Sequence, residues 1–360
     1  MPSWPAIRSL LKFLLAIAII LAVGRRFALD LQGHSDLFSL PLRPAWLILS
    51  GLLYLLALGF SAFYWHRLLL KLGQKPTILG TVRAYYVSQT GKYLPGKAWA
   101  LFFRAALARQ AGVRTGVAVA SSFYEVLTTM SAGVLVAAVV FTWTALGNSH
   151  VASQIGWDSL RELLSGQPIE EVLLHAWVPS VLAVGLLIVI GAPILPPIFN
   201  RIVGRIGAPF RRDESLPLPR FDFVALVEGL IITGGGWFLL SASLWATLQG
   251  MLTDRPVWSW TDWVHATAYL GLAYVAGFII LVVPSGIGVR ELLLIPFLAS
   301  ELERLPNTPE SKARALAVLV VVGLRVVWTI AEVLTVAILY WVPVAPRLES
   351  LVPSGETGQG

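Results

Sequence analysis

The feature that most constrains this chain is a series of apolar stretches, several of which reach about 20 residues, enough for an α-helix to cross a bilayer. Of the 360 residues, 56% are hydrophobic and only 13% are charged. Soluble domains carry about 25% charged residues, so this composition does not suit a soluble fold. A membrane β-barrel would instead show alternating segments of about 10 residues, which this sequence lacks. The sequence therefore predicts an all-α, polytopic transmembrane helical bundle.

The apolar stretches predict six full crossings of the membrane. They cover residues 8–27, 45–66, 115–143, 177–199, 223–250 and 314–342. The first of them also has the composition of a cleaved signal peptide, because basic residues precede its apolar run. We expect residues 1–345 to form one domain with two halves, about 1–199 and 223–345, a linker at 200–222 and a disordered tail at 346–360.

Two further apolar segments, 80–107 and 262–300, are each interrupted by proline and glycine with charges beside the break. The first interruption reads Gln89-Thr90-Gly91-Lys92-Tyr93-Leu94-Pro95-Gly96-Lys97, and the second reads Val283-Pro284-Ser285-Gly286-Ile287-Gly288-Val289-Arg290-Glu291. Because lipid cannot hydrogen-bond a broken helix, such a break survives only inside protein or beside a water-filled cavity. One break in each half is typical of a transport site. We expect two re-entrant hairpins, with two ordinary crossings as the alternative for the second segment.

The charges of the loops predict the orientation in the membrane. Basic residues surround the first hairpin between 67 and 114 and fill the linker, whereas the loop 144–176 is acidic. Because basic loops stay in the cytoplasm, we expect both termini to be cytoplasmic. The two hairpins then enter from opposite sides, as in an inverted repeat. The tryptophans that we expect at the outer interface are Trp143, Trp157, Trp177, Trp258, Trp260 and Trp263.

Charged residues inside the predicted membrane segments need an explanation, because a charge at the bilayer centre costs about 2.5–3.5 kcal/mol on insertion scales. The candidates are Lys92, Lys97, Glu125, Glu228, Arg290, Glu291, Arg325 and Glu332. One interpretation is internal ion pairing, in which a glutamate neutralises Arg290 or Arg325. Glu125 and Glu332 are the glutamates that we expect in that role. The other interpretation is a polar cavity for a phosphate, because helix ends at the breaks offer free N–H groups to anions.

Other chemistries find little support in the sequence. There is no cysteine, which excludes disulfides, and the five histidines are too scattered to predict a metal site. Gly91-Lys92 lacks the rest of a P-loop, and Gly286-Ile287-Gly288 follows an apolar helix and not a strand. The net charge of +7 lies in short loops, where it indicates contact with anionic phospholipids and not with nucleic acid. We expect no cofactor and no metal.

The residues around the two breaks resemble the lysylphosphatidylglycerol synthase transmembrane region, a family of flippase-like integral membrane proteins. The resemblance covers roughly residues 8–342 and rests on Tyr93-Leu94-Pro95-Gly96, Arg104, Glu125, Pro284-Ser285-Gly286-Ile287-Gly288-Val289-Arg290-Glu291 and Arg325. It implies a helical bundle that moves aminoacylated phosphatidylglycerol between leaflets. In the best-understood members a separate cytoplasmic domain makes the lipid. This chain ends just after its last predicted span, so we do not expect the synthase activity to carry over.

We therefore predict a flippase-like membrane protein that translocates a phospholipid or a polyprenyl-linked lipid, and we favour a transporter over an enzyme. The predicted substrate-binding residues are Lys92, Pro95, Gly96, Lys97, Arg104, Glu125, Pro284, Gly286, Gly288, Arg290, Glu291, Arg325 and Glu332. The basic members would meet a phosphate, and the acidic members would balance them or contact a cationic or sugar head group. Arg325 would tie the last span to the second hairpin.

Two alternatives to a transporter stay open. The first is a membrane glycosyltransferase that uses a polyprenyl-phosphate sugar, with Glu125 or Glu291 as the general base. The second is an accessory subunit that docks a separately encoded lipid-modifying enzyme or glycosyltransferase. Its intramembrane charges would then be structural.

Overall fold

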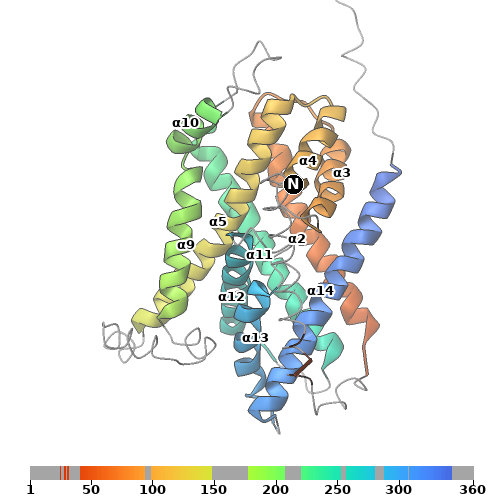
Figure 1. The fold of residues 1–360 in the computed structure, drawn as a ribbon, viewed down its shortest axis with the longest axis vertical. Coiled ribbons are helices and arrows are strands. Elements are labelled where there is room, and N and C mark those ends of the chain that lie inside the picture. Colours follow the sequence, from red (N-terminus) through yellow and green to blue (C-terminus); the bar gives the residue numbers. More distant parts are fainter. Residues whose placement is uncertain are drawn as a thin grey trace, which may run out of the picture.

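The computed structural model is an all-α bundle (Figure 1). It describes residues 25, 28–29, 31, 41–93, 99–147, 177–206, 220–252, 257–279, 288–306 and 308–342, none of which lies in a strand. Ten α-helices and one 3-10 helix are delimited within these residues. They are α2 (Pro44–Lys71), α3 (Ile78–Ser88), the 3-10 helix η2 (Gln89–Tyr93), α4 (Trp99–Gln110), α5 (Thr115–Gly147), α9 (Val178–Ile194), α10 (Pro196–Ile206), α11 (Phe223–Met251), α12 (Trp260–Ile279), α13 (Val289–Leu302) and α14 (Glu310–Tyr340).

Four of these helices are long and apolar enough to cross a membrane. They are α2, α5, α11 and α14, with 28, 33, 29 and 31 residues. They coincide with the predicted crossings at 45–66, 115–143, 223–250 and 314–342, which are confirmed as apolar helices of spanning length. The beginning of α11 is fixed by Asp222, whose carboxylate accepts a hydrogen bond from the backbone N–H of Ala225 at 2.6 Å. The predicted crossing at 8–27 lies almost entirely outside the described residues.

The predicted crossing at 177–199 differs from a single continuous helix. Helix α9 ends at Ile194 and α10 begins at Pro196, and the two helices meet at an angle of 61°. A run of prolines explains the bend, because Pro193 lies inside α9 and Pro196 and Pro197 follow at once, and proline removes the hydrogen bonds that continue a helix. The described part of the chain thus holds four candidate spans, or five if the bent pair counts as one.

Two pairs of shorter helices flank the predicted breaks, and Figure 1 places them at opposite ends of the bundle. The first pair is α3 and α4, with η2 after α3, and the second pair is α12 and α13. The helices that leave the breaks, α4 and α13, have 12 and 14 residues. At about 1.5 Å per residue they measure roughly 18 and 21 Å, too short alone for a hydrocarbon core of about 30 Å. Residues 94–98 and 280–287 are not described, and with them the site candidates Pro95, Gly96, Lys97, Pro284 and Gly286.

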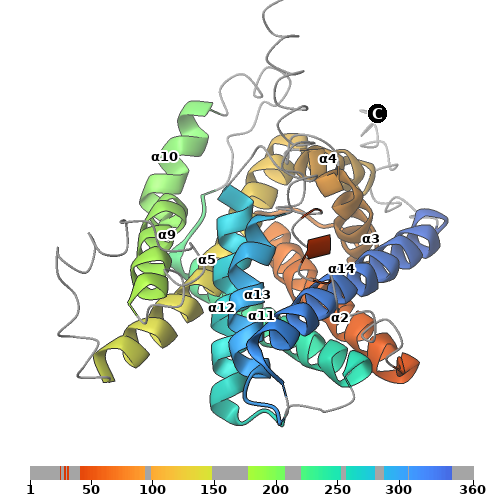
Figure 2. The same ribbon diagram turned by 60° about the horizontal axis from the view of Figure 1, so that its bottom comes forward.

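Helices α2 and α11 pack against each other at the centre of the bundle (Figure 2). Their contact contains buried hydroxyl groups, because the Ser50 Oγ lies 2.8 Å from both the Ser243 Oγ and the Thr247 Oγ1. The indole N–H of Trp328 on α14 donates to the Ser243 Oγ at 2.7 Å. Hydroxyls and small side chains are the groups that hold helices together in lipid, where the hydrophobic effect gives no preference for helix association.

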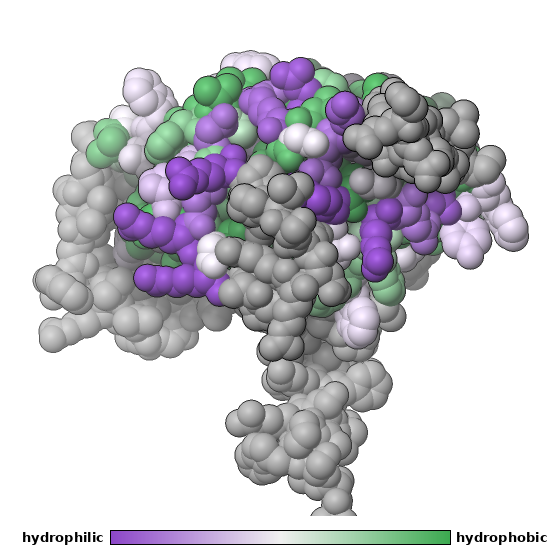
Figure 3. Space-filling model, turned by 90° about the horizontal axis from the view of Figure 1, so that it is seen from above, coloured by the Kyte–Doolittle hydropathy of each residue, from purple (hydrophilic) through white to green (hydrophobic). Residues whose placement is uncertain are grey.

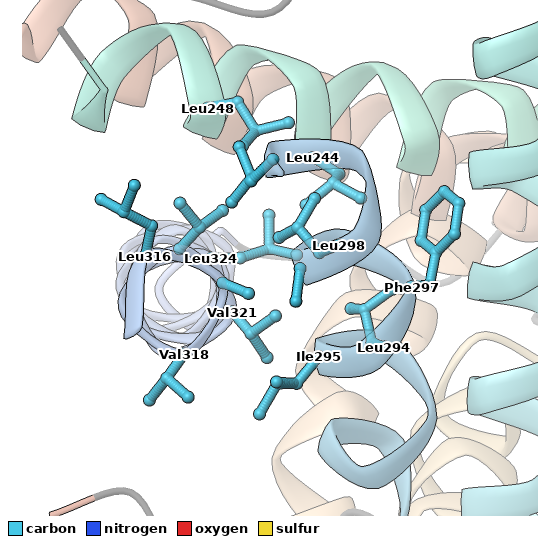
Figure 4. Packing of buried hydrophobic residues seen from close by; sticks show 14 of the residues in the cluster. Leu244, Leu248, Leu294, Ile295, Phe297, Leu298, Leu316, Val318, Val321 and Leu324 are labelled. Carbon is cyan, nitrogen blue, oxygen red and sulfur yellow. The ribbon is translucent and has the colours of Figure 1, made fainter. Parts of the chain in front are cut away.

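Apolar clusters pack each helical pair against the long spans. At the second pair, α13 packs between α11 and α14 through buried side chains that include Leu244, Leu298 and Leu324 (Figure 4). At the first pair, a separate cluster joins α2, α3, α4 and α5 and includes Trp65 and Tyr124. Both breaks therefore lie between helices that are packed into the bundle.

The two ends of the bundle differ in charge. The end formed by α3, α4 and α10 is basic, and Figure 3 looks onto this end and shows hydrophilic residues gathered over it. Its described basic residues are Arg67, Lys71, Lys75, Arg83, Arg109, Arg114, Arg201, Arg205 and Arg220. At the opposite end Trp143 and Trp260 are 80% and 73% exposed, as expected for an interfacial belt, whereas Trp177 is buried. Trp157 lies outside the described residues.

Candidate functional site: a polar cavity between the two breaks

A cavity of about 320 Å³ lies between the two helical pairs. Its wall comes from η2 and α4 on one side and from α12 and α13 on the other, with α2, α3, α5 and α11 completing it. Most of the lining is apolar, but four charged side chains reach it: Lys92, Arg104, Glu125 and Arg290. The cavity thus joins predicted site residues that are up to about 200 positions apart in the sequence, in both halves of the chain.

Arg104 on α4 forms an ion pair with Glu125 on α5, and both side chains are buried, at 2% and 1% exposure. The Glu125 carboxylate also accepts hydrogen bonds from the hydroxyls of Tyr85 and Thr129, at 3.1 and 3.0 Å. The guanidinium of Arg104 stacks on the ring of Tyr85, 4.0 Å from its centroid, and its Nε donates to the Ser88 Oγ at 3.3 Å. Both ions of this pair thus have further polar partners, which is the condition under which a buried pair is tolerated.

Lys92 on η2 forms an ion pair with Glu332 on α14, so this contact joins the first break to the last span. Two tyrosine hydroxyls donate to the same carboxylate, that of Tyr93 at 2.7 Å and that of Tyr54 at a shorter distance. The ring of Tyr54 is in turn stacked on Trp328, with centroids 4.5 Å apart. The carboxylate of Glu332 therefore holds three partners from two different helices of the first half.

Arg325 on α14 forms an ion pair with Glu291 on α13, which is the tie between the last span and the second break that the sequence predicts. The Glu291 carboxylate also accepts the backbone N–H of Gly288 at 2.5 Å, and so caps the first turn of α13. Gly288 has a positive φ of 90°, a conformation that only glycine adopts without strain. The predicted site residue Gly288 thus has a structural role at the start of this helix.

Arg290 is the charged cavity residue that differs from the others. Its guanidinium lies over the ring of Tyr274, 3.6 Å from the centroid. Its Nε is buried without a hydrogen-bond partner, and no ion pair joins Arg290 to another residue in the described part of the chain. A cation at membrane depth without an anionic partner is a mark of a functional site.

The pairing of charges corrects one expectation from the sequence. Glu125 pairs with Arg104 and not with an arginine of the second half, and Glu332 pairs with Lys92. The reason is topological, because α4 returns directly beside α5 and η2 lies beside α14. Arg290 thereby keeps no carboxylate partner among the described residues.

Several aromatic residues of the site were missed by the sequence analysis. Tyr54, Tyr85 and Tyr274 line the cavity, and each contacts a charged side chain there. A tyrosine in the interior of an apolar span could have been a signal, since a phenol in lipid needs a hydrogen-bond partner. Trp237 also lines the cavity and donates its indole N–H to the backbone carbonyl of Thr129 at 2.8 Å.

The cavity offers little for the chemistry of a glycosyltransferase. Glu125 is the single carboxylate on its wall among the described residues, and that carboxylate is held by Arg104, Tyr85 and Thr129. A general base must be within hydrogen-bond reach of an acceptor hydroxyl, and the oxygens of this carboxylate already contact three other groups. No group of three His, Asp or Glu side chains that could hold a metal is found in the same part of the chain.

No protein-family model matches the chain, and a comparison with curated proteins finds no match. The resemblance at the two breaks therefore rests on the motifs alone and stays a prediction.

Proposed function

We propose that this chain is an integral membrane transporter of flippase type that moves a phospholipid or a polyprenyl-linked lipid between leaflets. The single observation that carries the proposal is the cavity between the two helical pairs, with the guanidinium of Arg290 on its wall, which has no ion-pair partner among the described residues. A head group would cross through this cavity while the acyl or prenyl chains stay in the surrounding lipid. Arg290 would receive the phosphate, because a planar guanidinium binds phosphate oxygens in a bidentate manner.

The order of the helices supports this proposal, because it would suit an inverted repeat. Helices α2, α3, α4 and α5 match α11, α12, α13 and α14 in order and in relative length, since each set has a long helix, a helical pair around a break, and a second long helix. The contacts match as well: α5 packs on α11 and α12, and α14 packs on α2 and α3. The two helical pairs lie at opposite ends of the bundle (Figure 1), as two re-entrant hairpins would. Inverted repeats of this kind alternate access to a central site by rocking one half against the other.

The ion pairs indicate which contacts would move together and which would change in such a movement. Two of the three pairs, Arg104–Glu125 and Arg325–Glu291, lie within one repeat and would move with it. The pair between Lys92 and Glu332 joins the two repeats beside the cavity, and Glu228 on α11 joins them again at the basic end through Arg67 and Lys71 on α2. A rocking movement would therefore have to keep or exchange these contacts, and a phosphate that reaches Lys92 would compete directly with the Glu332 carboxylate.

The charge of the two ends supports an orientation with the α3–α4 end in the cytoplasm. Helix α10 lies at this end, with Arg201 and Arg205 exposed and apolar Ile198 and Ile202 partly exposed on it. We propose that α10 lies in the cytoplasmic interface and contacts anionic phospholipids, as basic amphipathic helices do. Both termini of the chain would then be cytoplasmic.

The test is the leaflet distribution of fluorescent lipids in vesicles that contain the purified protein. The wild type should expose inner-leaflet phospholipid or polyprenyl-linked lipid to a membrane-impermeant quencher. Arg290→Gln should slow this exposure at least about tenfold, because the phosphate would lose a charge-assisted bidentate contact. Arg109→Gln, at the exposed end of α4, is the matched control and should behave as the wild type. If the wild type moves none of the lipids tested, the chain is not a flippase.

A further inference from the structure

We propose that the cavity selects lipids by charge and takes a head group with one net negative charge, a phosphodiester, in preference to a head group with net positive charge. This inference rests on the proposed function and names its substrate class. Its basis is the balance of positive and negative side chains that line the cavity or adjoin it. It would exclude the lysyl ester of phosphatidylglycerol, which the family resemblance implies, as the preferred cargo.

Every carboxylate that lines or adjoins the cavity in the described part of the chain is paired with a cation. Glu125 is paired with Arg104, Glu291 with Arg325, and Glu332 with Lys92. Each of the three also accepts at least one further hydrogen bond, from tyrosine or threonine hydroxyls or from a backbone N–H. An incoming ammonium group would have to displace a cation from one of these pairs and leave that cation buried and unpaired. That exchange is unfavourable in a site that is shielded from water.

The three pairs cancel, and the cation that remains is Arg290. The segments at the two breaks cannot supply a carboxylate to balance it, because residues 94–98 and 280–287 contain neither aspartate nor glutamate. Among the described residues that line or adjoin the cavity, the charge is therefore positive, and an anion is the ligand that would neutralise it.

The placement of Arg290 suits a phosphodiester in particular. Tyr274 covers one face of the guanidinium, at 3.6 Å, so the group can meet a ligand only with its N–H edge or its other face. The N–H edge of a guanidinium matches two oxygens of a phosphodiester, and the aromatic ring holds the group in place for that contact. The remainder of the described wall is mostly apolar, and its polar side chains, Ser61, Gln89, Thr129 and Thr233, are neutral, so a lysyl side chain finds no unpaired carboxylate there.

The test compares three fluorescent lipids in the reconstituted vesicles: phosphatidylglycerol with a net charge of about −1, phosphatidylcholine with no net charge, and lysylphosphatidylglycerol with a net charge of about +1 at neutral pH. We expect wild-type protein to move phosphatidylglycerol at least about tenfold faster than the lysyl ester, because like charges in an interface of this kind oppose binding. Phosphatidylcholine should fall between the two. A rate for the lysyl ester that equals or exceeds that of phosphatidylglycerol would overturn the inference.

Two substitutions assign the selectivity to Arg290. Arg290→Lys keeps the charge and should keep the order of the three lipids at a lower rate, since ammonium lacks the bidentate geometry. Arg290→Gln removes the charge and should bring the rates for phosphatidylglycerol and its lysyl ester to within about twofold of each other. If Arg290→Gln leaves the wild-type ratio intact, another group selects the charge and the inference fails. Movement of all three lipids at equal rates would refute charge selection and leave the flippase proposal standing, whereas movement of none would refute the flippase proposal itself.

Discussion

Helix α4, the second helix of the first predicted hairpin, carries an arginine that pairs with a glutamate on α5, and helix α13, the second helix of the second predicted hairpin, carries a glutamate that pairs with an arginine on α14. The two contacts occupy matching places in the two halves but have opposite polarity. They also differ in burial. Arg104 is 2% exposed, whereas Arg325 is 27% exposed.

This comparison distinguishes the ion pairs, which attach each short helix to the next long helix, from Arg290, which can bind a ligand in the cavity. Either polarity joins a short return helix to its span, because an ion pair at membrane depth is favourable whichever helix carries the cation. Only in the second hairpin, however, does a further cation, Arg290, stand beside the pair with no partner among the described residues. The first predicted hairpin therefore has the more deeply buried ion pair, and the second carries Arg290, the side chain that can bind a ligand.

The largest effect should come from breaking the buried pair of the first hairpin. Glu125→Gln would leave the buried guanidinium of Arg104 without its counter-charge and lower the free energy of unfolding by about 3–5 kcal/mol. The corresponding Glu291→Gln should cost less than half as much, since Arg325 is 27% exposed and is therefore less completely desolvated than Arg104. Unfolding in mixed detergent micelles measures both.

The double replacement Arg104→Met with Glu125→Leu tests the cause of that loss. Removing both charges should restore much of the stability, because an apolar pair of similar volume leaves no buried charge unpaired, and the remaining loss comes from the hydroxyls of Tyr85 and Thr129, which lose their acceptor. If the double variant is as unstable as Glu125→Gln, the loss comes from packing, and the burial of the ion pair does not explain why Glu125→Gln costs more than Glu291→Gln.

The glycine of the first break should be the next most sensitive position. A Cβ at Gly91 would collide with the backbone of Trp99 and Ala100, so the start of α4 would have to shift. We expect Gly91→Ala to lower the free energy of unfolding by about 3 kcal/mol. Gly234→Ala is the matched control, because its Cβ would point into open space within α11, and it should be neutral or stabilising by up to about 1 kcal/mol.

Replacing the glycine of the second break should lower the free energy of unfolding by less, and for a different reason. Gly288→Ala meets the positive φ of 90° and should cost about 1–2 kcal/mol through backbone strain. Gly112, with φ of 81° in the turn between α4 and α5, offers the same strain away from the cavity. Gly112→Ala should therefore match Gly288→Ala in stability but not in lipid movement. Equal loss of transport in both would mean that transport only reports stability.

The smallest effect concerns the contact between the two halves. Tyr54→Phe removes one buried hydroxyl from Glu332 and should cost about 1 kcal/mol, since the ion pair with Lys92 remains. Tyr93→Phe, at the exposed edge of the same carboxylate, should cost less. If Tyr93→Phe lowers the free energy of unfolding in detergent more than Tyr54→Phe does, the hydrogen bond from Tyr93 is the stronger of the two, contrary to this prediction.

The sequence predicted the long elements well and the contacts between charges poorly. Spans such as 115–143 and 223–250 follow from local hydrophobicity, and α5 and α11 match them. The bend after α9 was missed, because hydropathy continues through Pro193 and Pro196 although both residues interrupt a helix.

The candidate charges were recognised one by one from their cost in lipid, but their partners depend on packing between distant segments. Lys92 and Glu332 are separated by 240 positions, and nothing in the spacing indicates that they meet. The partner of Arg104 is 21 positions away and was still missed, since it requires that α4 turn back beside α5. A local pattern can thus predict that a charge needs a partner, while the fold decides which one it receives.

The bend between α9 and α10 has a consequence for the bilayer itself. Helix α9 has 17 residues and measures roughly 26 Å, while α10 turns away by 61° and carries exposed arginines. An apolar helix shorter than the hydrocarbon core of about 30 Å draws the two leaflets together around it. Since α9 packs on the outside of α5, the membrane along this flank would be thinned. A lipid that passes there would face a shorter hydrocarbon path between the two interfaces than anywhere in the undisturbed bilayer.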